Sequence, residues 1–271
     1  MKKVSKLCAG LCVASLLVVL AASCAFAAPA DALKGKTLRL AINATFAPFE
    51  SATQGGGFEG LDIDIVNRLA EKLGFKLDIS DMEFAGLVGA LTSGRADFVI
   101  SGISPTPERL ERLDASSSYF YPTIAIISRK AAPYPTIESL NGRKVAVPFG
   151  TSYEKRAETF PGVTVSPING TPAVVQELRN TRVDAAVLDG CQAAVFAGMY
   201  PELEFHLLPL EMTRETSYAI LFPKGSELRE PIDAALKEIV DSGELYKMIE
   251  KWMGAAYLAD YRERITQSKG K

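Results

Sequence analysis

The feature that most constrains the fold is a regular alternation of strand and helix patterns that begins near residue 37. Residues 37–42 (TLRLAI) alternate in polarity, which is typical of a strand. Residues 61–73 (LDIDIVNRLAEKL) carry apolar side chains at helical spacing, and Gly74 follows as a helix stop. The pattern continues with a strand at 75–79, a helix at 84–91 and a strand at 96–100. This order predicts βαβ units and a mostly parallel sheet.

The alternation then starts again in the second half of the chain. We predict strands at 143–147, 163–168 and 183–188, with helices at 152–159 and 173–179. The tripeptide Arg95-Ala96-Asp97 before one strand is echoed by Arg182-Val183-Asp184 before another, which indicates two similar lobes. Further elements are expected at 218–222 (strand), 231–240 and 245–252 (helices). Residues 263–271 are polar and are expected to form a flexible tail.

The first 27 residues have the pattern of a secretory signal peptide. The basic start MKKVSK precedes the apolar run LCVASLLVVLAA, and the small-x-small pattern Ala25-Phe26-Ala27 suits cleavage. A second interpretation is a lipoprotein leader in which Cys24 becomes lipidated. Both interpretations predict export, and we expect a periplasmic protein. Only one of the four cysteines, Cys191, lies beyond the leader, so the mature chain cannot form an internal disulfide.

Composition excludes several other classes of protein. Hydrophobic residues make up 48% of the 271 residues and charged residues 23%, a balance typical of globular rather than disordered chains. The net charge of −2 offers no basic surface for nucleic acid. A single histidine and a single mature cysteine leave no plausible zinc site and no histidine-based catalytic triad.

Polar groups gather where the predicted strands end. In open α/β sheets, ligands bind beyond the carboxyl ends of the strands. Four such ends carry suitable residues, two in each half of the chain: NATFAPF (43–49), SGIS (101–104), FGTS (149–152) and Asp189-Gly190. A ligand held by all four would lie in a cleft between two lobes.

These groups together suit a zwitterion. Arg109 can grip a carboxylate with two parallel hydrogen bonds, and backbone amides near helix starts add donors. Asp189 can accept from an ammonium group, and aromatic rings offer apolar walls. The candidate ligand-binding residues are Phe46, Phe84, Ser101, Gly102, Ser104, Arg109, Thr151, Ser152 and Asp189. Each also has a structural alternative: Arg109 as a solvated residue at a helix start, Asp189 as a helix N-cap, and the phenylalanines as core.

Taken in order, several segments resemble the bacterial solute-binding proteins that serve ABC importers of polar amino acids. The segments are ATFAPFE, GFEGLDIDIVNRLAEKLG, EFAGLVGALTSGRADFVISGISPTPER, GRKVAVPFGTS and VDAAVLDG, and the resemblance covers residues 37–253. It implies an α/β fold of type II, with two lobes joined by two crossing strands and a ligand cleft between them. Lobe 1 would comprise residues 37–121 and 220–262, and lobe 2 residues 125–214.

The resemblance also implies roles for individual residues. Arg109 and Ser104, with Thr151 and Ser152 from the second lobe, would hold the α-carboxylate. Asp189, with Ser101, Gly102 and Ser104, would hold the α-ammonium, and Phe46 and Phe84 would line the side-chain pocket. Members that bind basic amino acids or glutamine often carry aspartate where this chain has Asn43. We therefore predict a neutral side chain, with Phe149 as a further aromatic wall.

The function that follows is binding rather than catalysis. We expect an extracytoplasmic, monomeric receptor that closes its lobes on an L-amino acid and delivers it to an ABC transporter permease, with no cofactor, metal or catalytic residue. A competing hypothesis is an enzyme resembling cyclohexadienyl (arogenate) dehydratase, which shares the fold and the SGIS…R signature. Its catalytic glutamate aligns with Gln192, which cannot serve as a general acid. A third hypothesis is a soluble receptor that also feeds a sensor.

Overall fold

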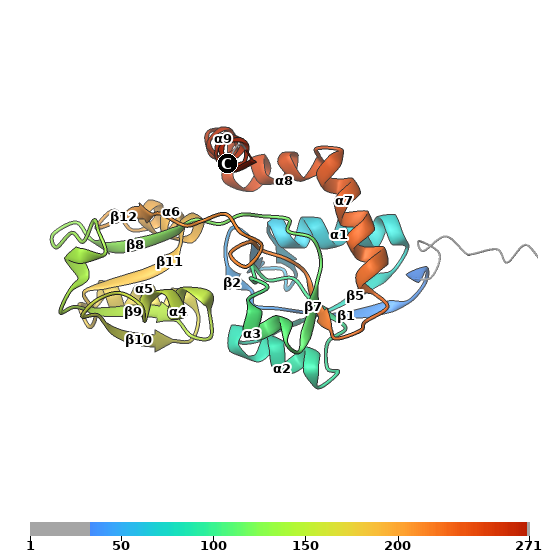
Figure 1. The fold of residues 1–271 in the computed structure, drawn as a ribbon, viewed down its shortest axis with the longest axis horizontal. Helices are drawn as coiled ribbons and strands as arrows, with labels where there is room; N and C mark the ends of the chain where they lie inside the picture. Colours follow the sequence, from blue (N-terminus) through green and yellow to red (C-terminus); the bar gives the residue numbers. More distant parts are fainter. Residues whose placement is uncertain (1–32, 270–271) are drawn as a thin grey trace, which may run out of the picture.

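The computed structural model describes residues 33–269, and its two lobes are each built on a five-stranded sheet (Figure 1). The first sheet has the order β5 (Lys76–Asp81), β1 (Thr37–Ile42), β6 (Phe98–Val99), β13 (Leu221–Pro223) and β7 (Leu113–Ala115). The second has the order β10 (Thr164–Ile168), β9 (Lys144–Pro148), β11 (Ala185–Asp189), β8 (Ile124–Arg129) and β12 (Leu203–Leu208). A small third sheet joins β2 (Thr45–Phe46), β3 (Glu50–Ala52) and β4 (Phe58–Glu59). The predicted leader lies outside the described residues.

The two large sheets repeat one plan, as the tripeptide echo predicts. In each, three parallel strands are followed by an antiparallel one, so the sheets are mixed rather than mostly parallel. Asp97, just before β6, accepts a hydrogen bond from the backbone N–H of Arg39 (2.7 Å). Asp184, just before β11, accepts one from the N–H of Lys144 (2.9 Å). The two aspartates therefore fasten the start of the central strand to its neighbour in the same way in both lobes.

Helices cover the sheets and bury their apolar faces. In lobe 1 these are α1 (Leu61–Leu73), the 3₁₀ turn η2 (Phe84–Gly86), α2 (Leu87–Thr92) and α3 (Pro107–Leu110). In lobe 2 they are η3 (Glu138–Leu140), α4 (Ser152–Ala157), α5 (Thr171–Arg179) and α6 (Gly190–Met199). Helix α1 keeps its predicted bounds, because its apolar side chains are buried on one face and Gly74, with φ of 71°, ends it in the left-handed conformation.

Two segments connect the lobes and pair with each other. One runs from β7 to β8 and the other from β12 to β13, and Phe120 of the first forms an antiparallel bridge with Tyr218 of the second. The crossings bring aromatic rings together, since Phe120 stacks on Tyr218 with ring centroids 5.8 Å apart. Among residues 33–269, no helix is long and apolar enough to cross a membrane.

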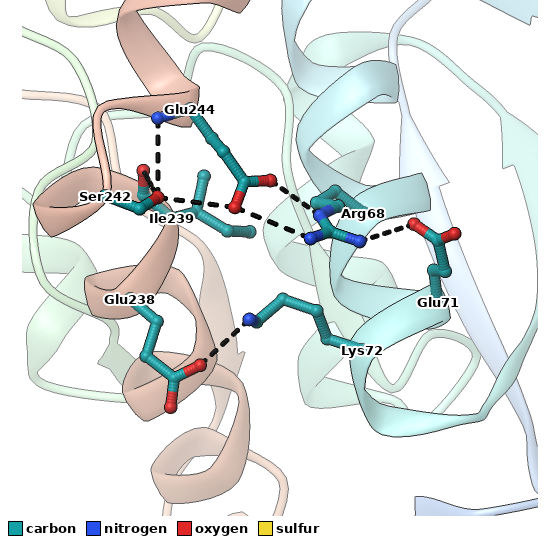
Figure 2. A network of polar contacts seen from close by, with 7 residues as sticks. All are labelled: Arg68, Glu71, Lys72, Glu238, Ile239, Ser242 and Glu244. Carbon is teal, nitrogen blue, oxygen red and sulfur yellow. Dashed lines mark hydrogen bonds and ion pairs between the residues drawn. The ribbon is translucent and has the colours of Figure 1, made fainter.

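The last three helices, α7 (Arg229–Asp241), α8 (Glu244–Met253) and α9 (Ala255–Lys269), return to lobe 1. A network of ion pairs ties α7 and α8 to α1 (Figure 2). Arg68 on α1 contacts Glu244 at 2.6 Å and Glu71 at 2.7 Å, and Lys72 contacts Glu238 at 2.9 Å. Exposed pairs of this kind contribute little each, so the apolar faces of these helices supply most of the attachment.

Residues 263–269, which belong to the stretch that the sequence predicts as a flexible tail, are helical and form the end of α9. Tyr257 and Tyr261 of α9 pack on the lobe 1 core, and Tyr261 accepts a hydrogen bond from the N–H of Tyr121 in the first crossing segment (3.1 Å). The guanidinium of Arg264 lies over the ring of Tyr261, with 5.3 Å to its centroid. The polar sequence of this stretch therefore covers an aromatic cluster instead of fraying.

Candidate functional site

A cavity lies between the lobes, at the strand ends where the sequence predicts a ligand. Eight of the ten predicted site residues line it: Asn43, Phe46, Phe84, Gly102, Ser104 and Arg109 from lobe 1, and Thr151 and Ser152 from lobe 2. Two further predicted residues, Ser101 and Asp189, are fully buried and do not line the cavity. The remaining lining residues are Glu83, Pro148, Phe149, Tyr153, Asn169, Gly170 and Thr171.

The lobes are closed over this cavity. Its volume is about 20 Å³, room for little more than one water molecule. The hydrogen bonds that span the lobes include one from Nη2 of Arg109 to the carbonyl of Gly150 (3.0 Å) and one from Nε2 of Gln192 to that of Thr45 (3.3 Å). An amino acid can therefore enter only when the lobes move apart. A wider groove of about 280 Å³ adjoins the cavity on the side of Arg109 and Phe149.

Arg109 is the cationic centre of the site. It lies on α3, which begins at Pro107 after the N-cap Thr106. Its Nη1 donates to the carbonyl of Ser104 (2.8 Å), and its guanidinium carbon lies 5.5 Å from the ring centroid of Phe84. Burial lowers the pKa of Arg109 to about 10, so the side chain keeps its charge at neutral pH. A fixed, partly desolvated cation is suited to an anionic group.

On the lobe 2 side, the predicted anion-binding segment is already occupied by helix capping. The hydroxyl of Thr151 accepts from the N–H of Glu154 (3.2 Å) and donates to the carbonyl of Pro148 (2.7 Å). The carboxylate of Glu154 accepts from the N–H of Gly150 (2.6 Å). This is close to a capping box, in which a threonine and a glutamate three residues later satisfy the donors at a helix start. Ser152, the first residue of α4, is half-buried.

Asp189 caps α6, which confirms the capping alternative considered from the sequence. Its Oδ1 accepts from the N–H groups of Cys191 (2.7 Å) and Gln192 (3.1 Å). Its Oδ2 accepts from the hydroxyls of Tyr218 (2.8 Å) and Tyr153 (3.1 Å). Burial raises the pKa of Asp189, although these four hydrogen bonds oppose the rise. Tyr153 also lines the cavity, so it connects the buried carboxylate to the ligand space.

Asn43 and Gly102 are held rigidly at the lobe 1 wall. The side-chain amide of Asn43 donates to the carbonyl of Met82 (2.8 Å), and its oxygen accepts from the hydroxyl of Thr45 (2.7 Å). Gly102 has φ of 47°, and a Cβ added there would lie 2.2 Å from the ring of Phe46. Only glycine therefore lets the loop lie flat on this ring. Ser101 lies beneath the wall and accepts from the N–H of Asn43 (3.0 Å).

The sequence analysis missed lining residues that its own rule could have found. Asn169, Gly170 and Thr171 follow β10, and Glu83 follows β5, so both groups lie just beyond carboxyl ends of strands. The tip of Gln192, by contrast, is engaged with Thr171 (2.9 Å) and with lobe 1, and it does not line the cavity. Within residues 33–269, no cluster of three or more His, Cys, Asp or Glu side chains could hold a metal ion.

Comparisons with known proteins agree with this geometry. The arginine-binding extracellular protein ArtP of Bacillus subtilis is 33% identical over 220 residues, covering 80% of this chain and 86% of ArtP. An ancestral arginine-binding protein has been solved with arginine (35% identity, TM-score 0.75, 80% of this chain and 98% of that one) and with glutamine (36%, 0.76, 81% and 98%).

A third relative bears on the enzyme hypothesis. The ancestral amino-acid-binding protein AncCDT-1, described as a precursor of cyclohexadienyl dehydratase, has 31% identity and a TM-score of 0.72, covering 80% of this chain and 95% of that one. The relatives are binding proteins, and the chain is a binding protein rather than an enzyme. The family model for "Bacterial extracellular solute-binding proteins, family 3" matches residues 38–255. The chain therefore belongs to this family, as the amino-acid-binding component of an ABC transporter.

Proposed function

We propose that this protein is a periplasmic receptor that closes its lobes on a single L-amino acid and presents it to the permease of an ABC importer. The observation that carries the proposal is the closed cavity lined from both lobes, with Arg109 as its fixed cation. The α-carboxylate of the ligand would lie on Arg109, Ser104 and the start of α4, since these groups combine a charge with donors.

The α-ammonium would lie toward Asp189, with Gly102 and Ser104 completing its shell. Ser101 lies beneath the cavity wall and would support this loop from behind. Both oxygens of Asp189 already accept two hydrogen bonds each. A ligand ammonium would therefore replace the hydroxyl of Tyr153, which reaches Asp189 from the cavity wall. Such an exchange leaves the buried carboxylate with a full set of donors before and after binding.

The side chain of the ligand is proposed to be neutral and polar. Asn43 supplies an amide where a cationic side chain would need a carboxylate, and Phe46, Phe84 and Phe149 offer apolar walls. A side-chain amide would suit this mixture, because it can exchange hydrogen bonds with Asn43 without bringing an uncompensated charge into the closed cavity. The complex of the related ancestral protein with glutamine is consistent with such a ligand.

A second candidate is a cationic side chain, favoured by Glu83. Glu83 carries the only carboxylate among the residues that line the cavity, and it lies at the exposed edge beside Phe84. A long side chain such as that of arginine could reach this edge and form an ion pair there. Relatives described as arginine-binding make this candidate worth a direct comparison.

Calorimetric titration with L-glutamine, L-asparagine, L-serine, L-arginine, L-lysine and L-histidine separates the candidates. We expect one of the neutral polar amino acids of the panel to bind most tightly to the wild type, and the variant Glu83→Gln to bind it unchanged. Tightest binding of arginine or lysine would overturn the neutral assignment, and loss of that binding in Glu83→Gln would identify Glu83 as the counter-charge. Binding of none of the panel would overturn the proposal as a whole.

Binding and closure are coupled through the contacts between the lobes. The bond from Arg109 to Gly150 forms only when the lobes are together, so a ligand that orders Arg109 also favours closure. The crossing segments would act as the hinge. Small-angle scattering of the protein with and without the tightest-binding amino acid should show a smaller radius of gyration in the complex; an unchanged radius would argue against closure.

A further inference from the structure

Two carboxyl groups are buried together beneath the binding loop. Glu50 lies on β3 and Asp62 in the first turn of α1, and both side chains are 0% exposed. The two groups lie close together, since each one affects the pKa of the other. Neither belongs to the ligand contacts proposed above, and two neighbouring carboxylates would repel each other in a buried site. Their protonation state therefore needs a physical explanation.

The hydrogen-bond pattern points to one shared proton. Oε1 of Glu50 accepts from the hydroxyl of Ser101. Oδ2 of Asp62 accepts from the N–H of Gly102 (2.8 Å) and from the hydroxyl of Tyr119 (2.9 Å). The other two oxygens, Oε2 of Glu50 and Oδ1 of Asp62, find no N–H or O–H donor among residues 33–269. A proton on Oε2 of Glu50, donated to Oδ1 of Asp62, satisfies both oxygens at once.

Electrostatics favour the same arrangement. Burial, followed by the nearby charge of Asp62 and a smaller effect of Asp81, raises the pKa of Glu50 well above its usual range. Burial also raises the pKa of Asp62, but the hydrogen bonds from the N–H of Gly102 and the hydroxyl of Tyr119 oppose the rise. Asp62 is the better site for the remaining charge, because it accepts two hydrogen bonds, from Gly102 and Tyr119, and lies at the start of α1. Tyr119 stays a donor, because burial raises its own pKa.

The pair controls the backbone of the binding loop. Ser101, which donates to Glu50, in turn accepts from the N–H of Asn43 at the cavity wall (3.0 Å). Gly102, which donates to Asp62, is the residue on which the Phe46 ring lies. The positions of Asn43, Gly102 and Phe46, three residues that line the cavity, therefore all depend on the two carboxyl groups.

We propose that Glu50 and Asp62 are positioning residues for amino-acid binding, and that they share one proton whose hydrogen bond holds Ser101 and Gly102 in the orientation that the ligand meets. This inference rests on the proposed function for its role, but the shared proton stands independently of any ligand. Loss of the proton would place two adjacent charges in a buried site and loosen residues 101–104. Replacement of Glu50 by glutamine keeps the bonds, since Oε1 can accept from Ser101 and Nε2 can donate to Asp62.

The first test measures whether the folded protein retains this proton, from the pH dependence of its unfolding. A group with a raised pKa in the folded state gives stability that is present below its unfolded pKa, about 4.3 for glutamate, and is lost as the pH rises toward the folded pKa. The folded wild type keeps a proton that its unfolded chain releases. Between pH 5.5 and 7.5, its unfolding equilibrium constant in urea should rise about tenfold more per pH unit than that of Glu50→Gln. The exposed variant Glu59→Gln on β4 should follow the wild type, and equal slopes for wild type and Glu50→Gln would overturn the shared proton.

The second test measures how firmly residues 101–104 are held in the absence of a ligand. Amide hydrogen exchange of residues 101–104 should be unchanged in Glu50→Gln and at least tenfold faster in Glu50→Leu, which fills the space but cannot form the bonds. Equal exchange in the two variants would overturn the positioning role. Titration with L-glutamine and L-arginine should then show Glu50→Gln within threefold of the wild type and Glu50→Leu more than tenfold weaker. If the wild type binds none of the six amino acids of the panel, the proposed function fails, while the pH dependence of unfolding and the hydrogen exchange still decide this inference.

Discussion

Replacing Arg109 by alanine should weaken amino-acid binding severely, because this side chain joins the two lobes and, in the proposed binding mode, also holds the ligand carboxylate. Its guanidinium donates to the carbonyl of Ser104 within lobe 1 and to that of Gly150 in lobe 2. Its pKa of about 10 leaves it charged at neutral pH despite its burial. Removal would leave a ligand carboxylate enclosed without a counter-charge and would also delete one of the bonds that join the closed lobes.

The size of the effect follows from the cost of an uncompensated buried charge. Breaking a buried ion pair from one side costs about 3–5 kcal/mol. At about 1.4 kcal/mol per factor of ten, the dissociation constant should rise roughly 100- to 4,000-fold. Arg109→Lys should fall between wild type and alanine, because an ammonium keeps the charge but cannot present two parallel donors to a carboxylate.

Isothermal titration calorimetry at pH 7 with the tightest-binding amino acid of the panel measures this change. Arg112→Ala is the matched control, since Arg112 is exposed, lies three residues further along the chain and carries the same charge. We expect it to stay within about twofold of the wild type, because exposed charges act weakly through solvent. An increase of less than tenfold for Arg109→Ala would refute its role as the carboxylate clamp.

Three further predictions concern the supporting structure. Gly102→Ala should lose about 1–3 kcal/mol of stability and most amino-acid binding. Gly94→Ala should lose only the free energy of the backbone strain, since both glycines have positive φ but only at Gly102 would the new Cβ meet a phenylalanine ring. Equal losses of stability in the two variants, measured by urea unfolding, would contradict this. Tyr153→Phe should lower the free energy of unfolding by about 1–3 kcal/mol, because the buried carboxylate of Asp189 loses a donor, and a change under 0.5 kcal/mol would count against it. Burial alone would raise the pKa of Asp97, but the hydrogen bonds from Arg39 on β1 outweigh burial, so the pKa of Asp97 is lowered. Ionised Asp97 therefore stabilises the folded protein above about pH 4, and this stabilisation is lost as the pH falls further. The stability gap between wild type and Asp97→Asn should therefore narrow as the pH falls from 5 to 3, and a constant gap would exclude this linkage.

The parts of the fold that the sequence predicts well are those set by local pattern. The bounds of β1 and α1 coincide with the predicted residues 37–42 and 61–73, because apolar periodicity and a terminal glycine are properties of the segment itself. The two-lobed plan also follows from local pattern, since the order of strands and helices is repeated. Helix α9 is different, because its arginine Arg262 finds an aromatic partner only when folding places it over the ring of Tyr246 on α8.

The candidate site shows the same division between local and tertiary information. Strand ends identify where a ligand can lie, and eight of the ten proposed residues do line one cavity. Residue type alone cannot tell whether a polar group faces that cavity or supports it from behind. Ser101 and Asp189 have suitable chemistry, yet their hydrogen bonds are taken by other parts of the protein. Apart from the helix amides that Asp189 caps, these partners lie far away in sequence and become visible only in three dimensions.

Asp189 shows how a polar group that lies behind the cavity wall can affect ligand specificity. Its carboxylate is satisfied by helix amides on one oxygen and tyrosine hydroxyls on the other, so it can be buried without a ligand at little cost. In the binding mode proposed above, the ligand must therefore offer a better donor than a phenol, and a charged ammonium would do so because charge-assisted hydrogen bonds are stronger than neutral ones. A carboxylic acid that lacks the ammonium could contact Arg109 but could not displace Tyr153 from Asp189. Discrimination between an amino acid and the matching acid without its amino group thus depends on Tyr153 as much as on Asp189.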